Sequence, residues 1–322
     1  MSRLVILIFF LSLIVVCIAP DVHAADGPLQ VRNQFPFFLG IMPPYLEPAA
    51  PRDEVFAGLS HSSVYVIADR QTWVVNMDLE LTEFDLRVKK KIGSRTELGI
   101  DVPVLRPSGG FFDRPLDQWH SLLNVGDYGR HARPFNEFLY EITLNDQPVI
   151  RGVNDRTGLG DVRLTAKQVL LDNAPLVAVM AGIEVPTGDA RAGYGNGSYD
   201  ASAALLADVR FLKFYHGTVN LGVTVPGDLK GYQTVGLRTF WYGGLSLEAA
   251  WWNRFSVIVQ TLAQTTPLPK TGIRQTDWPG VLLTIGGRYY GRSGNIEFSL
   301  TEDPDTAGAP DFIATIGYAR GF

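Results

Sequence analysis

Apolar and polar residues alternate over most of the chain. Between Asp200 and Phe211 every odd-numbered residue is apolar, while Asp208 and Arg210 lie on the opposite face. A period of two residues is that of a β-strand with one dry face. The same pattern predicts an all-β protein of about twelve antiparallel strands, at 55–69, 78–91, 95–105, 158–171, 175–187, 199–212, 217–226, 234–251, 254–266, 279–290, 294–303 and 310–322.

The alternation continues to the last residue. Ile316, Tyr318 and Phe322 share an apolar face that Arg320 alone interrupts. We therefore expect the last strand to close a barrel, with Tyr318 and Phe322 as the signal for the barrel assembly machinery. Aromatic residues near the short predicted turns indicate a membrane-interface girdle, with strand propensity as the alternative explanation: Phe211, Phe214, Tyr215, Trp251, Trp252, Phe255, Tyr289, Tyr290 and Phe322.

The first 24 residues are typical of a secretory signal peptide. Arg3 precedes an apolar run that ends at Ala19, and Ala24 provides a small residue for cleavage. The alternative is an uncleaved anchor, for which the apolar run is short. The peptide contains Cys17, the one cysteine in the sequence. The mature chain is therefore expected to form no internal disulfide.

The remaining sequence predicts a membrane barrel. No uncharged apolar stretch after Ala24 approaches 18 residues, and the mean hydropathy is +0.07. A chain without such a stretch crosses a bilayer only as a closed sheet. We expect a periplasmic N-terminal segment at 25–54, a transmembrane antiparallel β-barrel at 55–322 in the outer membrane of a Gram-negative bacterium, and a long loop at 103–157. A periplasmic sandwich or lipocalin-like barrel has the same period and is the soluble alternative.

Charged residues on the predicted inner face are the first candidate functional feature. Inward-facing charges need water or partners, so they indicate a water-filled lumen, an ion-pair network or a mixture of both. The two signs are nearly balanced, which argues against strong ion selectivity. The predicted lumen-lining residues are Arg87, Lys89, Asp161, Arg163, Lys167, Glu184, Asp208, Arg210, Glu248, Arg288 and Glu297.

The loop at 103–157 is the second candidate. It is too long for an ordinary connection and has apolar residues at helical spacing, with Asp113 as a candidate N-cap and Pro115 in the first turn. Its predicted helix could plug the lumen against the inward-facing Leu206, Ile258 and Leu262, or lie as a lid or surface helix. The plug candidates are Leu116, Trp119, Leu122 and Leu123.

The third candidate is His61 with Ser63, which share one face of a strand. The same spacing occurs in outer-membrane phospholipases, where a histidine activates a serine. The sequence offers no third group to orient the histidine, so we predict that the protein is not an enzyme. The sequence indicates no metal site or cofactor, and its formal net charge of −5 argues against nucleic acid as a partner.

Several stretches resemble an uncharacterised proteobacterial outer-membrane family, domain of unknown function 3187, and more distantly the barrels of a MetA-type phenol-degradation pathway. They are GPLQVRNQFPFF, TELGIDVPVL, GGFFDRPLDQWHSLL, RPFNEFLY, GLGDVRLTAKQVLL and GIEVPTGD. The firmest matches are Gly158, Gly160, Asp161, Pro186, Thr187 and Gly188. The resemblance implies an outer-membrane barrel and carries no established catalytic residue.

Together these observations predict a passive channel or transporter for a small solute, hydrophobic solutes included. Its expected partners are outer-membrane lipid, the assembly machinery and the unknown solute. The alternatives are a structural or assembly barrel without transport and, third, an outer-membrane lipid hydrolase.

Overall fold

The computed structural model describes residues 26–112, 114, 134–211, 214–252, 254–305 and 307–322. Fifteen strands form one antiparallel sheet, and a further pairing between β2 and β3 closes it. Twelve strands remain in the barrel once the short additions β4, β5 and β6 are set aside, as the alternation predicts. They are β1 (Glu54–Asp69), β2 (Trp73–Ile92), β3 (Thr96–Ser108), β7 (Val162–Leu171), β8 (Leu176–Val185), β9 (Asp200–Phe211), β10 (Tyr215–Val225), β13 (Phe240–Trp252), β14 (Phe255–Gln264), β15 (Gly280–Tyr290), β16 (Asn295–Glu302) and β17 (Phe312–Gly321).

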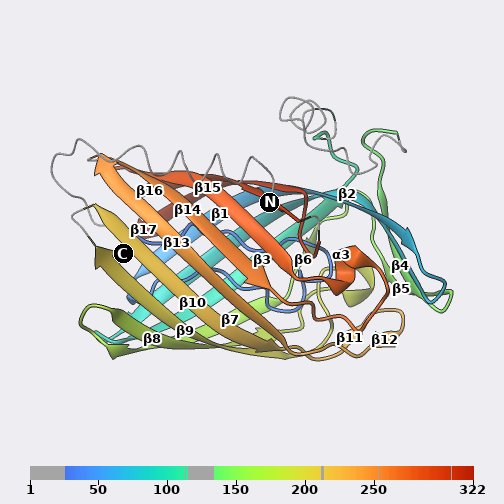
Figure 1. Cartoon of the computed structure of the whole chain (residues 1–322), viewed down its shortest axis with the longest axis horizontal. Coiled ribbons are helices and arrows are strands. Elements are labelled where there is room, and N and C mark those ends of the chain that lie inside the picture. The colour runs from blue at the N-terminus through green and yellow to red at the C-terminus, as the bar shows by residue number, and fades with distance from the viewer. Residues whose placement is uncertain (1–25, 113, 115–133, 212–213, 253, 306) are drawn as a thin grey trace.

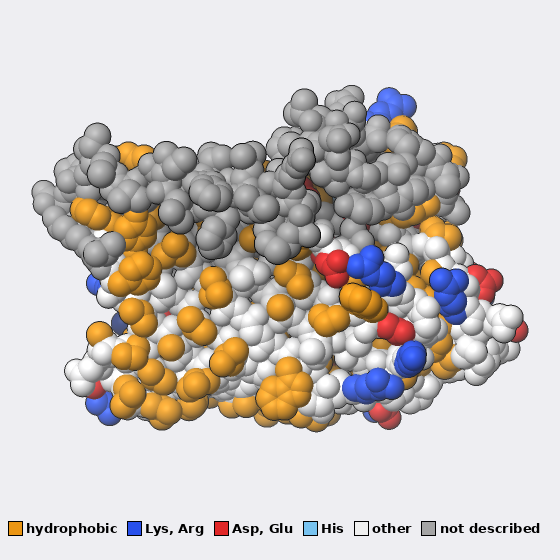
Figure 2. All heavy atoms as spheres, viewed as in Figure 1, with side chains coloured by type: hydrophobic (Ala, Val, Ile, Leu, Met, Phe, Trp, Pro, Cys, Tyr) orange, Lys and Arg blue, Asp and Glu red, His pale blue; other side chains and the backbone are white. Residues whose placement is uncertain are grey.

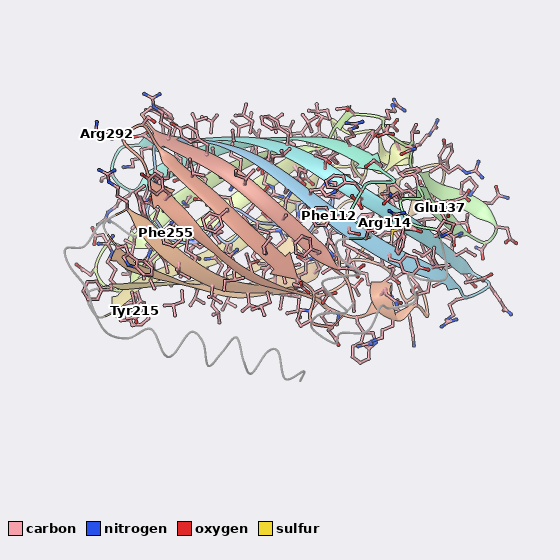
Figure 3. The ribbon with its side chains drawn as sticks, turned by 90° about the horizontal axis from the view of Figure 1, so that it is seen from above. Phe112, Arg114, Glu137, Tyr215, Phe255 and Arg292 are labelled. Atoms are coloured by element: carbon pink, nitrogen blue, oxygen red, sulfur yellow. The ribbon has the colours of Figure 1, made fainter. Side chains whose placement is uncertain are left out.

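The two ends of the barrel differ in their connections. Turns of two to four residues join the strands at one end, which we call the short-turn end, and Phe322 and the start of β1 lie there (Figure 1). The opposite, long-loop end carries the other connections. Figure 3 places Tyr215, Phe255 and Arg292 at the short-turn end and Glu137 in the opposite half.

Apolar side chains cover much of the outer wall. Figure 2 shows them gathered over the half nearest the short turns, while most visible charged side chains lie toward the long-loop end. Ile316 and Phe322 are 55% and 61% exposed on this wall. Among the described residues, no helix has the length and hydropathy to cross a membrane.

The connection between β3 and β7 contains a β-hairpin that the sequence prediction missed. Its strands, β4 (Leu139–Leu144) and β5 (Gln147–Arg151), extend the wall because β4 pairs with residues 73–78 of β2. Asn145 and Asp146 both have positive φ, as a tight hairpin turn requires. The helix predicted for this loop, with Leu116, Trp119, Leu122 and Leu123, lies outside the described residues.

Small elements complete the long-loop end. They are β6 (Gly158–Leu159), η2 (Ala190–Ala192), the paired β11 (Leu229–Lys230) and β12 (Thr234–Val235), and α3 (Arg274–Asp277). None of these described helices exceeds four residues.

Candidate functional site: a barrel lumen filled by the N-terminal segment

Residues 27–49, here called the luminal segment, are buried inside the barrel although they belong to no strand. The preceding residue, Asp26, lies at the short-turn end, where its carboxylate accepts a 2.8 Å hydrogen bond from Asn295. Its carbonyl accepts a hydrogen bond from Arg52, two residues before the first strand. The expectation of a periplasmic segment at 25–54 is therefore wrong for residues 27–49, because side chains of the inner wall bind them.

The first half of the luminal segment runs toward the long-loop end. Wall side chains and one loop carbonyl, rather than a strand ladder, bind its polar groups. The contacts are Gly27 N to Glu248 Oε2 (2.7 Å), Leu29 N to Gln260 Oε1 (2.9 Å), Arg32 Nε to Glu83 Oε1 (2.8 Å) and Asn33 Nδ2 to the Gly308 carbonyl (2.6 Å).

The middle of the luminal segment turns at the long-loop end through an aromatic cluster. Phe38 meets Phe240 edge to face, with ring centroids 5.7 Å apart. Phe35, Phe37 and Ile41 are buried in the same cluster, which includes the β4–β5 hairpin. Burial of these apolar side chains stabilises the turn in this position.

The second half returns toward the short-turn end and meets a different set of wall residues. The contacts are Met42 N to Glu184 Oε2 (2.5 Å), Arg163 Nη2 to the Pro43 carbonyl (2.7 Å), Tyr45 Oη to Asp85 Oδ2 (2.8 Å), Glu47 N to Asn220 Oδ1 (2.6 Å) and Ala49 N to Asp208 Oδ2 (2.9 Å). Specific wall groups thus hold both halves of the luminal segment.

One side of the lumen carries a row of charged residues, and we call it the charged wall. The row lies at directly paired positions of five neighbouring strands, namely Arg87, Asp101, Arg163, Glu184 and Asp200. The first four alternate in sign, which stabilises a sheet and satisfies buried charges, whereas Glu184 and Asp200 are two acidic groups side by side.

The strands opposite β3 and β7 in the barrel order are β14 and β15, which carry an apolar patch among inward polar residues. We call this patch the apolar wall. Its inward residues Ile258, Leu262 and Leu282 are buried with Leu29 and Leu46 of the luminal segment. The same apolar cluster includes Leu206. Residues of the luminal segment therefore cover the inward-facing patch that the sequence predicted as the contact of a helical plug.

Inward-facing glycines make room for the luminal segment. A Cβ on Gly244 would lie 2.6 Å from Leu46 Cδ2, and one on Gly286 would lie 2.8 Å from Leu29 Cδ1. Neither position has a positive φ in the structure. These glycines allow close approach of the luminal segment and of the neighbouring strand's backbone. Glycine within a strand pattern, here in the pairs 243–244 and 286–287, is the sequence signal that could have identified them.

Ten of the eleven predicted lumen-lining residues are buried, and Arg210 is exposed near the end of β9. Arg288 bonds Glu248 (3.0 Å) and Glu297 (2.8 Å), and Lys167 pairs with Glu97 (2.8 Å). These inward charges therefore belong to ion pairs, and the luminal segment joins the network through Glu47 and Arg32, whereas Asp161 is bound by backbone N–H groups. Three cavities beside the luminal segment have volumes of about 10, 20 and 10 Å³, each enough for about one water molecule, and a fourth, lined by Phe35 and the loop at Gly308, has about 110 Å³.

The glycine motifs of the family resemblance have a structural role. Asp161 accepts hydrogen bonds from the backbone of Gly188 (2.7 Å) and Asn196 (3.0 Å). Thr187 Oγ1 donates to the Gly160 carbonyl at 2.6 Å. The two motifs thus hold the loop after β8 against the start of β7.

His61 lies on the outer wall, where the structure supplies the third group that the sequence did not reveal. His61 Nε2 is 2.6 Å from Glu80 Oε2, and Nδ1 is 2.9 Å from Thr82 Oγ1. Glu80 also accepts hydrogen bonds from the backbone of Phe111 (2.9 Å) and Phe112 (2.5 Å). The prediction that no group orients His61 is therefore wrong.

This outer arrangement nevertheless favours a structural role. Both ring nitrogens of His61 are engaged, so neither is available to activate Ser63 in this conformation. The rings of Phe111 and Phe112 lie 5.0 and 5.6 Å from the imidazole. We call the contact of His61 and Glu80 with Phe111 and Phe112 the outer clasp. The described residues contain no group of three or more histidine, cysteine or acidic side chains able to hold a metal ion.

A family model described as "Protein of unknown function (DUF3187)" matches residues 5–322. Curated proteins gave no match. Among solved structures, the COG4313 outer membrane channel from Pseudomonas putida F1 is similar with 12% identity and a TM-score of 0.56, over 94% of this chain and 100% of that chain. The toluene transporter TodX of P. putida is similar with 11% identity and a TM-score of 0.42, over 85% and 92%. The first likeness shows a shared barrel fold.

Proposed function

We propose, from the premise that the chain belongs to the DUF3187 family, that it is a passive channel for a small solute in the outer membrane of a Gram-negative bacterium. The luminal segment closes this channel at rest. The observation that carries the proposal is that a twelve-stranded wall encloses a segment outside the sheet.

Barrel size supports this proposal. Eight strands are enough for side chains alone to fill a barrel, so twelve strands leave additional space. Here residues 27–49 occupy that space. Within the described part of the chain, their covalent connection to the barrel wall is the short link that precedes Glu54. Their withdrawal breaks no strand pairing, so the wall can remain closed while the lumen opens.

The bonds that retain the segment also support reversible closure. They join backbone groups of the segment to side chains such as Glu248, Gln260 and Asn220. Water can replace such partners when the lumen hydrates, and the net free energy of each hydrogen bond is about 1 kcal/mol. A structural barrel, the competing function, would need no lumen that can hydrate in this way.

A liposome-swelling assay tests the proposal with arabinose as the solute. Leu46→Asp places a charge in the apolar cluster, and deletion of residues 27–49 removes the segment. Both variants should swell liposomes at least tenfold faster than the wild type. Val153→Asp, at an exposed loop position, is the matched control. Wild-type swelling rates from both folded variants would favour the structural barrel.

A further inference from the structure

We infer that the lumen binds a small amphipathic carboxylate, with its carboxylate between Arg87 and Lys89 and its apolar body toward Ile258 and Leu262. This inference rests on the proposed channel function and names its solute class. Leu46 and Glu47 of the luminal segment occupy the two halves of this site in the closed state.

The carboxylate half of the site is formed by two cations on one strand. Arg87 and Lys89 each form an ion pair with Glu47, using different carboxylate oxygens. Such two-point recognition fixes a carboxylate in position and orientation. Asn220 holds the backbone of Glu47 through two hydrogen bonds, of 2.6 and 2.9 Å, so the segment presents this carboxylate firmly.

The neighbouring charges leave this pair of cations as the place for an incoming anion. Lys167 has Glu97 as a partner at 2.8 Å, and Arg163 lies 3.8 Å from Glu184. Among the ion pairs of the described residues, Lys89 pairs with Glu47 alone. When the segment leaves, Lys89 loses this partner and Arg87 retains only carboxylates at 3.7 Å or more.

The apolar half of the site lies on the other side of the luminal segment. Leu46 is fully buried in the cluster that includes Ile258 and Leu262, beside the recess above Gly244. Withdrawal of the segment would expose this patch to water. A solute with an apolar body would cover it again, at a gain of about 25 cal/mol per Å² of apolar area.

A short fatty acid such as hexanoate has both required parts. Acetate has the carboxylate without the body, hexanol has the body without the charge, and hexylammonium has the opposite charge. Binding at both walls therefore predicts that hexanoate interacts more strongly than the other three. These four compounds separate the contributions of charge and apolar area.

The test measures current through full-length Glu47→Gln in planar bilayers, with Leu46→Asp/Glu47→Gln as a second open variant. Hexanoate should reduce the current by half at a concentration at least tenfold below that of acetate, hexanol or hexylammonium. Adding Arg87→Gln and Lys89→Gln should abolish this preference. Lys90→Gln, which changes an exposed cation on the same strand, should preserve it.

The two proposals fail in different ways. Open variants that conduct but are blocked equally by all four compounds would overturn the solute class and leave the channel intact. Retention of the hexanoate preference after loss of both Arg87 and Lys89 would overturn the assigned site. Folded variants that do not conduct at all would overturn the channel function, and with it the solute class.

Discussion

The charged wall and the apolar wall hold the same segment by different physical means. The charged wall contributes Arg87 and Lys89, whose ion pairs with Glu47 weaken when water and salt enter. The apolar wall contributes Ile258 and Leu262, whose packing with Leu46 depends on shape and is insensitive to charge. Retention of the segment should therefore be set mainly by packing, and the choice of solute by charge.

The largest effect is expected from filling the recess of the apolar wall. Gly244→Leu adds atoms where even a Cβ would lie 2.6 Å from both Leu46 Cδ2 and the backbone oxygen of Thr261 on the neighbouring strand. In barrels that remain folded and heat-modifiable, the inserted side chain should displace the luminal segment and raise liposome swelling at least tenfold. Gly243→Leu points outward from the adjacent position and should leave swelling unchanged. Equal swelling by both variants would show that the recess does not retain the segment.

A smaller effect is expected on the charged wall. Glu47→Gln removes two ion pairs but keeps the size of the side chain and the packing of Leu46. The open probability in planar bilayers should rise about three- to tenfold. An increase from 0.1 to 1 M salt should raise the open probability of the wild type more than that of the variant, because salt screens charges. Of the described ion pairs between segment and wall, the variant keeps only that of Arg32 with Glu83. An identical salt response in both proteins would contradict this account.

The outer clasp should be independent of both lumen walls. Glu80→Gln weakens the hydrogen bond with His61 and the two hydrogen bonds that Glu80 accepts from the backbone N–H groups of Phe111 and Phe112. Limited proteolysis within residues 109–112 should become several-fold faster, while conductance stays at the wild-type value. Glu141→Gln removes an exposed ion pair with Arg151 and serves as the control. A change in conductance would show that the clasp and the lumen are coupled.

The smallest expected effect concerns pH at the long-loop end. Burial raises the pKa of Asp303, between β16 and β17, to about 7, although its carboxylate accepts hydrogen bonds from the backbone of Asp305 and Ala307. The folded loop therefore binds this proton more tightly than the unfolded chain does. Its contribution to stability is complete below about pH 4 and is lost as the pH rises through about 7.

Hydrogen exchange at Ala307, corrected for intrinsic exchange rates, measures this dependence. Protection should fall between pH 5 and pH 8. Asp303→Asn should show a flatter pH dependence, and Asp155→Asn, an exposed position in another loop, should retain the wild-type dependence. Protection that increases over this range would contradict the assigned pKa.

The barrel could be predicted from the sequence because each strand carries its own period. Strand β9 is an example, since the predicted strand at 199–212 agrees to within one residue with its observed limits, Asp200–Phe211. The luminal segment could not be predicted in this way. Its apolar residues, such as Leu29 and Phe35, follow no period because they contact walls on different sides. Its position depends on groups more than two hundred residues away, such as Glu248 and Gln260.

The candidate site was predictable only in part, because strand periods are local and the contacts of the luminal segment are not. Parity indicated that Arg87 and Lys89 face inward, since their strand has a regular period. It could not pair them with Glu47, which precedes the first strand. The β4–β5 hairpin, by contrast, has a local signal in Asn145 and Asp146 and could have been predicted.

The central claim is that the luminal segment closes an otherwise continuous lumen. Single-channel recording of the barrel without residues 27–49, in the same bilayers as the wild type, tests it most directly. We predict steady conductance from the shortened barrel and long closed periods from the wild type. A folded, heat-modifiable shortened barrel that conducts no better than the wild type would contradict the claim.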